Sequence, residues 1–325
     1  MSVRNILMAA AGAQPSLNVA DVFSAYTYIG TGSTKTINNG IDLAGNGGAV
    51  WIKTRSEIDS NIIVDTARGK DYILQTNTSG AQADYGAYVM QEFLSDGFRL
   101  GSQYNVNKSG ANFASWTFRK APRFFDVVTY SGNGSNRVLS HNLGAAPGMI
   151  LVKCANANTE WMVYHVGQTN ANYITKLNLT DAQASIGSVF NGTVPTDSEF
   201  SLGTYSETNG SGFSFVAYLF ANDEFPNGFI RCGSFVTDGS GGATVDLGWS
   251  PQFVIYKRIN STSNWTMLDT ARGWVDSAGN DDMRLFANTT AAEAGTQRGN
   301  PTSGGFSVVS ESASSSYIYM AIRAA

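Results

Sequence analysis

Two segments of the chain carry the same acid and base at the same spacing. They are Asp65-Thr66-Ala67-Arg68-Gly69 and Asp269-Thr270-Ala271-Arg272-Gly273. A carboxylate and a guanidinium three residues apart would offer an acid/base pair. Beside a glycine, the same residues more simply form a turn with a local salt bridge or a side-chain cap. We interpret both segments as turns.

Histidine chemistry has few candidates, because His141 and His165 are the only histidines. Ser-His-Asp catalysis would need one of them, and no Gly-x-Ser-x-Gly nucleophile elbow occurs in the sequence. His165 stands twelve residues after Lys153, where matching segments hold Asp65 and Asp269. We interpret it as a structural position, assign no catalytic residue, and expect the protein not to be an enzyme.

Paired acids would suit glycoside hydrolysis if they converged on a cleft. Three pairs are available: Glu57/Asp59, Asp223/Glu224 and Asp281/Asp282. Adjacent acids usually mark a solvated loop, and nothing in the sequence orients these pairs towards a shared site. The oxygen-rich stretch from Asp276 to Asp282 would suit calcium, but it lacks the ligand spacing of an EF-hand loop.

Cofactor and metal motifs are missing from the sequence. No phosphate-cradling Gly-x-x-x-x-Gly-Lys-Ser/Thr segment occurs. Cys154 and Cys232 are too few for a four-cysteine zinc site, and each lies in an apolar, strand-like segment. We expect two free, partly buried thiols, no cofactor and no bound metal.

Aromatic side chains are the remaining candidates for binding. Tyr104 and Trp274 lie in segments that we interpret as loops, where their rings could stack on a sugar. They are the candidate glycan contacts. Four other tryptophans are expected in the core. Trp161 and Trp265 share a position eight residues after a lysine in matching segments, and Trp51 and Trp116 lie in strand-like segments.

These residues belong to a threefold internal repeat of about 100 residues. Three apolar segments end in a lysine, at 48–53, 148–153 and 252–257, and the lysines are 100 and 104 residues apart. Further matching stretches follow in the same order: 77–83, 178–184 and 288–294, then 95–98, 197–200 and 303–306. Alternating aromatic strands close the units at 113–118, 215–220 and 317–322. Such a unit is too long for a solenoid turn or a propeller blade.

The repeat predicts the fold class and the boundaries. Short runs rich in Val, Ile, Phe, Tyr and Trp, separated by Gly-Asn and Asn-Gly turns, are typical of antiparallel strands. We expect an all-β fold of three tandem β-sandwich modules, jelly-roll or lectin-like in kind. The predicted units are an N-terminal arm (1–24), which would attach the chain, and modules at 25–122, 123–226 and 227–325.

Charge and hydropathy exclude two classes of binding partner. Charged residues are 14% of the chain and the net charge is −4, and no basic block occurs that would bind a phosphate backbone. No apolar run approaches the roughly 20 residues that span a bilayer. We expect neither nucleic-acid binding nor membrane insertion.

The sequence resembles a family of virion structural proteins of tailed bacteriophages, often described as tail-fibre-like. Trp116 to Pro122 and Phe124 to His165 carry much of the resemblance, together with Met8 to Gly12 and Gly47 to Lys53. The third repeat departs from the pattern, with an insertion at 274–283 and a shorter last loop. The resemblance implies a component of the phage particle, in the tail or baseplate or as a tail fibre, and it names no catalytic residue.

The partners that the resemblance implies are other virion proteins. Threefold fibres are usual in this class, so a homotrimer is expected, and a host surface glycan is a further candidate partner. Two alternatives remain open at this point: a capsid decoration or head-fibre protein, and a polysaccharide depolymerase at a tail tip.

Overall fold

The computed structural model describes residues 17–223, 228–275 and 282–325. Most of the predicted arm (1–24) lies outside these ranges. Within them the chain is all-β, as predicted, with several antiparallel sheets. No described helix is longer than four residues; the helices are α1 (Leu43–Asn46), α2 (Tyr104–Asn107), α3 (Ser206–Asn209), and the 3-10 turns η1 (Val19–Asp21), η2 (Gly86–Tyr88) and η3 (Thr270–Arg272).

One strand order occurs three times along the chain, each time in a six-stranded antiparallel sheet. The first sheet runs β1 (Phe23–Ile29), β9 (Asn112–Arg119), β3 (Gly48–Thr54), β4 (Ile62–Asp65), β5 (Tyr72–Gln75), β6 (Ala83–Asp84). The second runs β10 (Phe125–Ser131), β17 (Ser214–Ala221), β12 (Pro147–Cys154), β13 (Met162–His165), β14 (Tyr173–Lys176), β15 (Ala184–Ser185). The third runs β18 (Ile230–Val236), β26 (Ser316–Arg323), β20 (Pro251–Arg258), β21 (Thr266–Asp269), β22 (Met283–Phe286), β23 (Ala294–Gly295). The strand that closes each repeat therefore lies between the first and the lysine-ending strand.

Each repeat also contributes a smaller sheet. These sheets are β2 (Lys35–Asn38), β8 (Gly97–Leu100), β7 (Met90–Leu94); β11 (Arg137–Ser140), β16 (Glu199–Leu202); and β19 (Ala243–Asp246), β25 (Gly305–Val308), β24 (Pro301–Thr302). In the first repeat, Ile37 and Phe98 of the small sheet share a buried cluster with Val50 and Ile62 of the large one. Successive side chains of a strand point to opposite faces of a sheet, and the central strands are buried at nearly every position. Each large sheet therefore has two buried faces, and the small sheet covers one of them.

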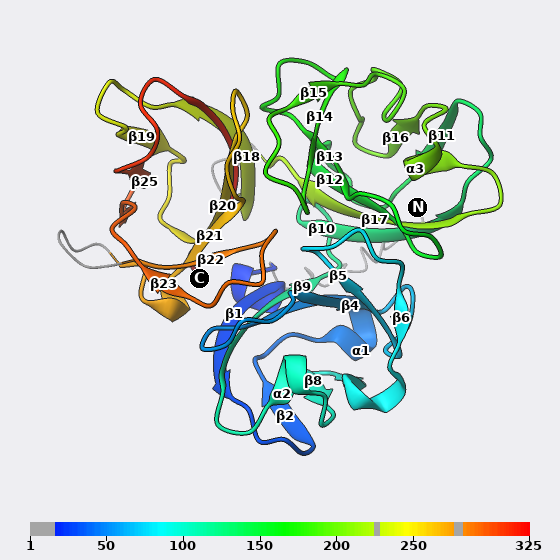
Figure 1. Cartoon of the computed structure of the whole chain (residues 1–325), viewed down its shortest axis with the longest axis vertical. Helices are drawn as coiled ribbons and strands as arrows, with labels where there is room; N and C mark the ends of the chain where they lie inside the picture. The colour runs from blue at the N-terminus through cyan, green and yellow to red at the C-terminus, as the bar shows by residue number, and fades with distance from the viewer. Residues whose placement is uncertain (1–16, 224–227, 276–281) are drawn as a thin grey trace, which may run out of the picture.

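The other faces of the large sheets meet in a common core. Figure 1 shows the three large sheets arranged around a shared centre. One buried cluster contains residues from all three sheets, among them Phe118, Phe220 and Phe253. The Phe118 ring centroid lies 5.4 Å from that of Phe220 and 6.5 Å from that of Phe253. Aromatic packing at these distances joins segments more than 100 residues apart.

The buried positions confirm several predictions. Trp51, Trp116, Trp161 and Trp265 are at most 2% exposed. Cys154 and Cys232 are free and buried.

Within the described ranges, no helix has the length and apolar character that crossing a bilayer requires.

Candidate functional site

Asp65 joins two repeats through a buried hydrogen-bond network. Its Oδ1 accepts from the backbone N of Arg68 at 2.8 Å, and its Oδ2 accepts from Arg68 Nε at 2.7 Å. This confirms the predicted turn with a local salt bridge. Asp65 Oδ2 also accepts from the hydroxyl of Tyr218, on β17 of the second repeat, at 2.7 Å.

Asp269 makes the corresponding network from the third repeat. It caps the turn of Arg272 at 3.0 Å through Oδ1 and pairs with Arg272 Nε at 2.6 Å. Its Oδ2 accepts from Trp116 Nε1, on β9 of the first repeat, at 2.8 Å. Both carboxylates are buried and bound by two partners, so neither faces a substrate.

His165 occupies the same position in the second repeat and contacts the third. Its Nε2 lies 3.0 Å from the carbonyl oxygen of Tyr319, and its Nδ1 accepts from the backbone N of Gly167 at 3.0 Å. The ring therefore carries its proton on Nε2. Burial lowers the pKa of His165 to about 4, so the ring is neutral at pH 7. The structural interpretation of this residue is confirmed.

The strand facing each of these residues explains the change from Asp to His. Trp116, Tyr218 and Met320 occupy equivalent positions, opposite Trp51, Leu151 and Ile255 in the sheet register. Trp116 and Tyr218 donate hydrogen bonds that a carboxylate accepts. Methionine has no donor, and His165 instead donates to the backbone of the same strand.

The three repeat lysines close a ring of contacts between the repeats. Lys53 Nζ donates to Thr290 O at 3.0 Å, Lys153 Nζ to Ser79 O at 3.1 Å, and Lys257 Nζ to Thr180 O at 2.8 Å. The contacts thus run from the first repeat to the third, from the second to the first, and from the third to the second. All three lysines are buried, and desolvation lowers the pKa of each to about 8.

A second ring of donors lies eight residues after each lysine. Trp161 Nε1 donates to Gln75 O at 3.0 Å, and Trp265 Nε1 donates to Lys176 O at 2.9 Å. In the first repeat Asn61 Nδ2 donates to Phe286 O at 3.2 Å. Asn61 thus makes the hydrogen bond to another repeat that Trp161 and Trp265 make. The sequence did not indicate this equivalence, because asparagine and tryptophan side chains share only an N–H donor.

The acid pairs do not assemble into a described catalytic site. Glu57 forms an ion pair with Lys108, 2.9 Å apart, and Asp223 pairs with Arg123. Glu224, Asp281 and the calcium-like stretch up to residue 281 lie outside the described residues. Among the residues that are described, no three His, Cys, Asp or Glu side chains gather where they could hold a metal.

The two candidate glycan contacts differ in exposure. Tyr104, on α2, is 52% exposed, and Lys108 Nζ lies 4.7 Å from its ring centroid. Trp274 is 1% exposed, packs against Phe306 and donates from Nε1 to Gly299 O at 2.9 Å. The segment after η3 folds back onto the third repeat, so Trp274 is a core residue and its ring cannot stack on a sugar. That part of the prediction is wrong.

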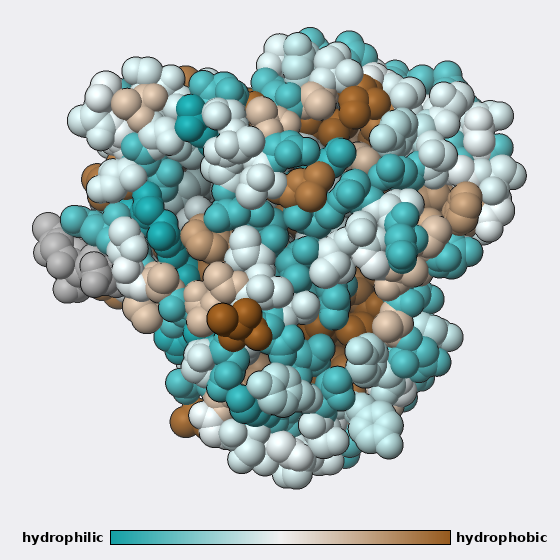
Figure 2. All heavy atoms as spheres, viewed as in Figure 1, coloured by the Kyte–Doolittle hydropathy of each residue, from teal (hydrophilic) through white to brown (hydrophobic). Residues whose placement is uncertain are grey.

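The molecular surface is mixed in polarity. Figure 2 shows hydrophobic residues in separate small groups among polar ones on the face in view. Exposed large apolar side chains include Ile58 and Val194, on different repeats. A scattered pattern of this kind is ordinary for a protein surface.

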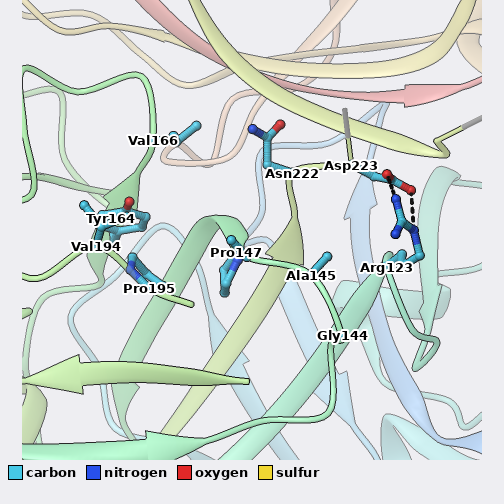
Figure 3. Close-up of a pocket in the computed structure, with 11 residues that line it drawn as sticks. Arg123, Gly144, Ala145, Pro147, Tyr164, Val166, Val194, Pro195, Asn222 and Asp223 are labelled. Carbon is cyan, nitrogen blue, oxygen red and sulfur yellow. Dashed lines mark hydrogen bonds and ion pairs between the residues drawn. The ribbon is translucent and has the colours of Figure 1, made fainter. Parts of the chain in front are cut away.

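One cavity is lined by residues of the second repeat, and one of them, Asn222, accepts a hydrogen bond from Cys232 N of the third repeat. It has a volume of about 460 Å³, within the usual range for small-molecule sites. Figure 3 shows Tyr164, Val194 and Pro195 on one side of it, Arg123 and Asp223 on the other, and Pro147 and Ala145 between them. Arg123 Nε donates to Asp223 Oδ2 at 3.1 Å, and Nη2 donates to Oδ1. No sequence pattern indicated this cavity, because its walls come from five separate segments.

Comparison with known families places the whole repeat region in one family. Residues 18–324 match the model of a family described as a domain of unknown function, DUF7483. The chain belongs to this family, and the single match spans all three repeats. A comparison with curated proteins found no match.

Proposed function

We propose that the chain is a non-enzymatic structural component of a bacteriophage particle, in the tail or baseplate or as a tail fibre. The proposal rests on the resemblance of Trp116 to Pro122 and Phe124 to His165 to tailed-phage virion proteins. The observation that supports a structural role is the use of Asp65, His165 and Asp269 in contacts between repeats. Residues that would otherwise be candidates for chemistry are thereby occupied.

The proposed architecture is three β-sandwich modules, at 25–122, 123–226 and 227–325, each with a large and a small sheet. Its strand β1 already begins at Phe23, before the first proposed boundary. The jelly-roll or lectin-like description remains part of this proposal. Residues 1–24 would attach the chain to the particle.

The proposed partners are other virion proteins and a host surface glycan. The exposed Tyr104 supports glycan contact, because a phenol ring can stack on the apolar face of a sugar. The homotrimer remains part of the proposal, motivated by the threefold fibres of this class. Native mass spectrometry should show three chains, and a single-chain mass alone would refute the trimer.

Locating the protein on intact particles tests the proposal. Gold-labelled antibody against the purified chain, imaged on particles by electron microscopy, should decorate the tail. Decoration of the head would favour a capsid decoration or head-fibre protein instead. Absence of the chain from purified particles would refute a virion role altogether.

The enzymatic alternative, a tail-tip depolymerase, needs two acids that converge on an open cleft. Incubation of the purified protein with host surface polysaccharide, followed by size-exclusion chromatography, distinguishes the depolymerase from the non-enzymatic structural protein. We expect unchanged polymer length. Shortened chains would refute the non-enzymatic proposal.

A further inference from the structure

The cavity of the second repeat has an apolar wall. Val166, Val194, Pro195, Ala145 and Pro147 line it. Val166 and Val194 are 43% and 63% exposed, which is unusual for valines that line a hollow. Displacement of water from exposed apolar side chains in a concave site by a ligand is favourable, so these valines would contribute to ligand binding.

Tyr164 adds one polar group to this wall. The residue is 3% exposed, and its ring packs edge-on against Phe190 with centroids 5.8 Å apart. Its hydroxyl has no hydrogen-bond partner in the part of the chain that the structure describes. Burial raises the pKa of Tyr164 to about 12, so the hydroxyl keeps its proton. A fixed, protonated hydroxyl at the wall of a cavity is a donor for a ligand oxygen.

The charged residues of the lining favour a neutral ligand. They are Arg123 and Asp223, and each neutralises the other through a bidentate ion pair. The backbone of Arg123 has a φ of 61°, an uncommon conformation for a residue with a side chain. That conformation, together with a hydrogen bond from Arg123 N to Leu143 O, fixes the residue that carries the guanidinium at the side of the cavity.

We propose that this cavity binds a neutral, acetamido-bearing sugar, an N-acetylhexosamine residue of a glycan. The acetyl methyl group packs against Val194 and Pro195, and the acetamido oxygen accepts a hydrogen bond from the Tyr164 hydroxyl. An acetamido group combines an apolar methyl with a strong acceptor, which is the combination that this wall presents. The inference rests on the proposed glycan contact and moves its site from the exposed Tyr104 to the cavity.

Isothermal titration calorimetry with N-acetylglucosamine and with glucose tests the assignment. We expect binding of N-acetylglucosamine in the millimolar range and binding of glucose at least about tenfold weaker, because glucose lacks the methyl group and the amide acceptor. Tyr164→Phe removes only a hydroxyl that bonds to no described residue, so the fold should be unaffected. It should weaken N-acetylglucosamine binding about fivefold or more, the effect of losing one hydrogen bond.

Two further variants distinguish the possible failures. Val194→Asp places a charge at the exposed rim and should abolish binding, whereas Tyr104→Ala should leave it unchanged. Loss of binding in Tyr104→Ala but not in Tyr164→Phe would overturn the cavity site and retain the glycan contact at α2. No binding of N-acetylglucosamine by the wild type would overturn the assignment, and labelling of particles would still test the virion role separately.

Discussion

His165 Nε2 lies 3.0 Å from the carbonyl oxygen of Tyr319, although the two residues are 154 positions apart. The bond joins the second repeat to the third at the place where Asp65 and Asp269 join the other pairs of repeats. Each of the three bonds uses a different chemical pair. Asp65, His165 and Asp269 therefore join neighbouring repeats from the same repeat position, although the hydrogen-bonding groups differ at each of the three contacts.

Replacement of His165 should change how stability depends on acid. Its folded pKa, about 4, is lowered from an ordinary value of 6.5, so the unfolded chain binds more protons between these values. Stability is therefore lost as the pH falls from about 6.5 to 4. In His165→Gln this loss, measured by urea unfolding, should be smaller by up to about 3 kcal/mol. An identical pH profile for the two proteins would contradict the neutral, buried histidine.

The three ring lysines should make the protein more stable in mild alkali. Their folded pKa values, about 8, lie below the ordinary 10.5, so the unfolded chain binds more protons between these values. Stability should rise from pH 7.5 to 9.5, by on the order of 1–2 kcal/mol for each lysine. Above pH 10 the buried Tyr218 and Tyr256 should oppose this rise in stability. Burial raises the pKa of both hydroxyls, so the unfolded chain loses these protons first and the free energy of unfolding falls as the pH increases.

A single-lysine variant isolates this contribution. Lys257→Met keeps an apolar stem of similar length and removes the titrating group, so the rise in stability with pH should lose about a third of its size. Lys70→Met is a matched control, because its ammonium group is paired at the surface with Asp71. An equal effect of both variants would show that the ring lysines are not special.

The tryptophans offer a paired test of the contacts between repeats. Trp161 Nε1 is bonded to Gln75 O, whereas Trp51 Nε1 is buried and has no hydrogen-bond partner among the described residues. Trp→Phe removes the same atoms at both sites. Trp161→Phe should therefore cost about 0.5–1.5 kcal/mol more than Trp51→Phe in unfolding free energy, because only the former loses a hydrogen bond and leaves Gln75 O with the longer contact from Thr78 N, at 3.4 Å. Equal costs would mean that the Trp161 bond contributes nothing net.

Asp269 should be among the residues least tolerant of change. Asp269→Ala leaves Arg272 buried without its nearest carboxylate and removes the acceptor of Trp116. Loss of one partner of a buried ion pair costs about 3–5 kcal/mol, and we expect the lower end of this range because Glu293 remains 2.9 Å from Arg272. Asp71→Ala, at an exposed pair, should change stability by about 1 kcal/mol or less. Similar chemical-denaturation midpoints for the two variants would contradict this.

The sequence predicted what depends on local pattern. The run from Phe215 to Phe220 identified a strand, although its alternation did not show that the strand is buried on both faces. The spacing of Asp65 and Arg68 predicted a turn with a local salt bridge or cap. Both properties depend on a few neighbouring residues. The shared repeat position of Trp161 and Trp265 also predicted that both lie in the core, as they do.

The contacts between repeats could not be predicted from local sequence patterns. Asp65 and Tyr218 meet because the large sheets pack around one centre, which no local pattern encodes. Trp274 lies in an insertion that the other repeats lack, so nothing indicated that it folds back against Phe306. The cavity beside Tyr164 arises in the same way, from segments that are adjacent only after folding.

Differential scanning calorimetry of the wild type and of Asp269→Ala tests whether contacts between repeats make the described sheets one cooperative folding unit. We expect a single transition in the wild type, with equal calorimetric and van't Hoff enthalpies, and a single transition at lower temperature in the variant. Separate transitions, of which only that of the third repeat shifts in the variant, would mean that the repeats unfold independently.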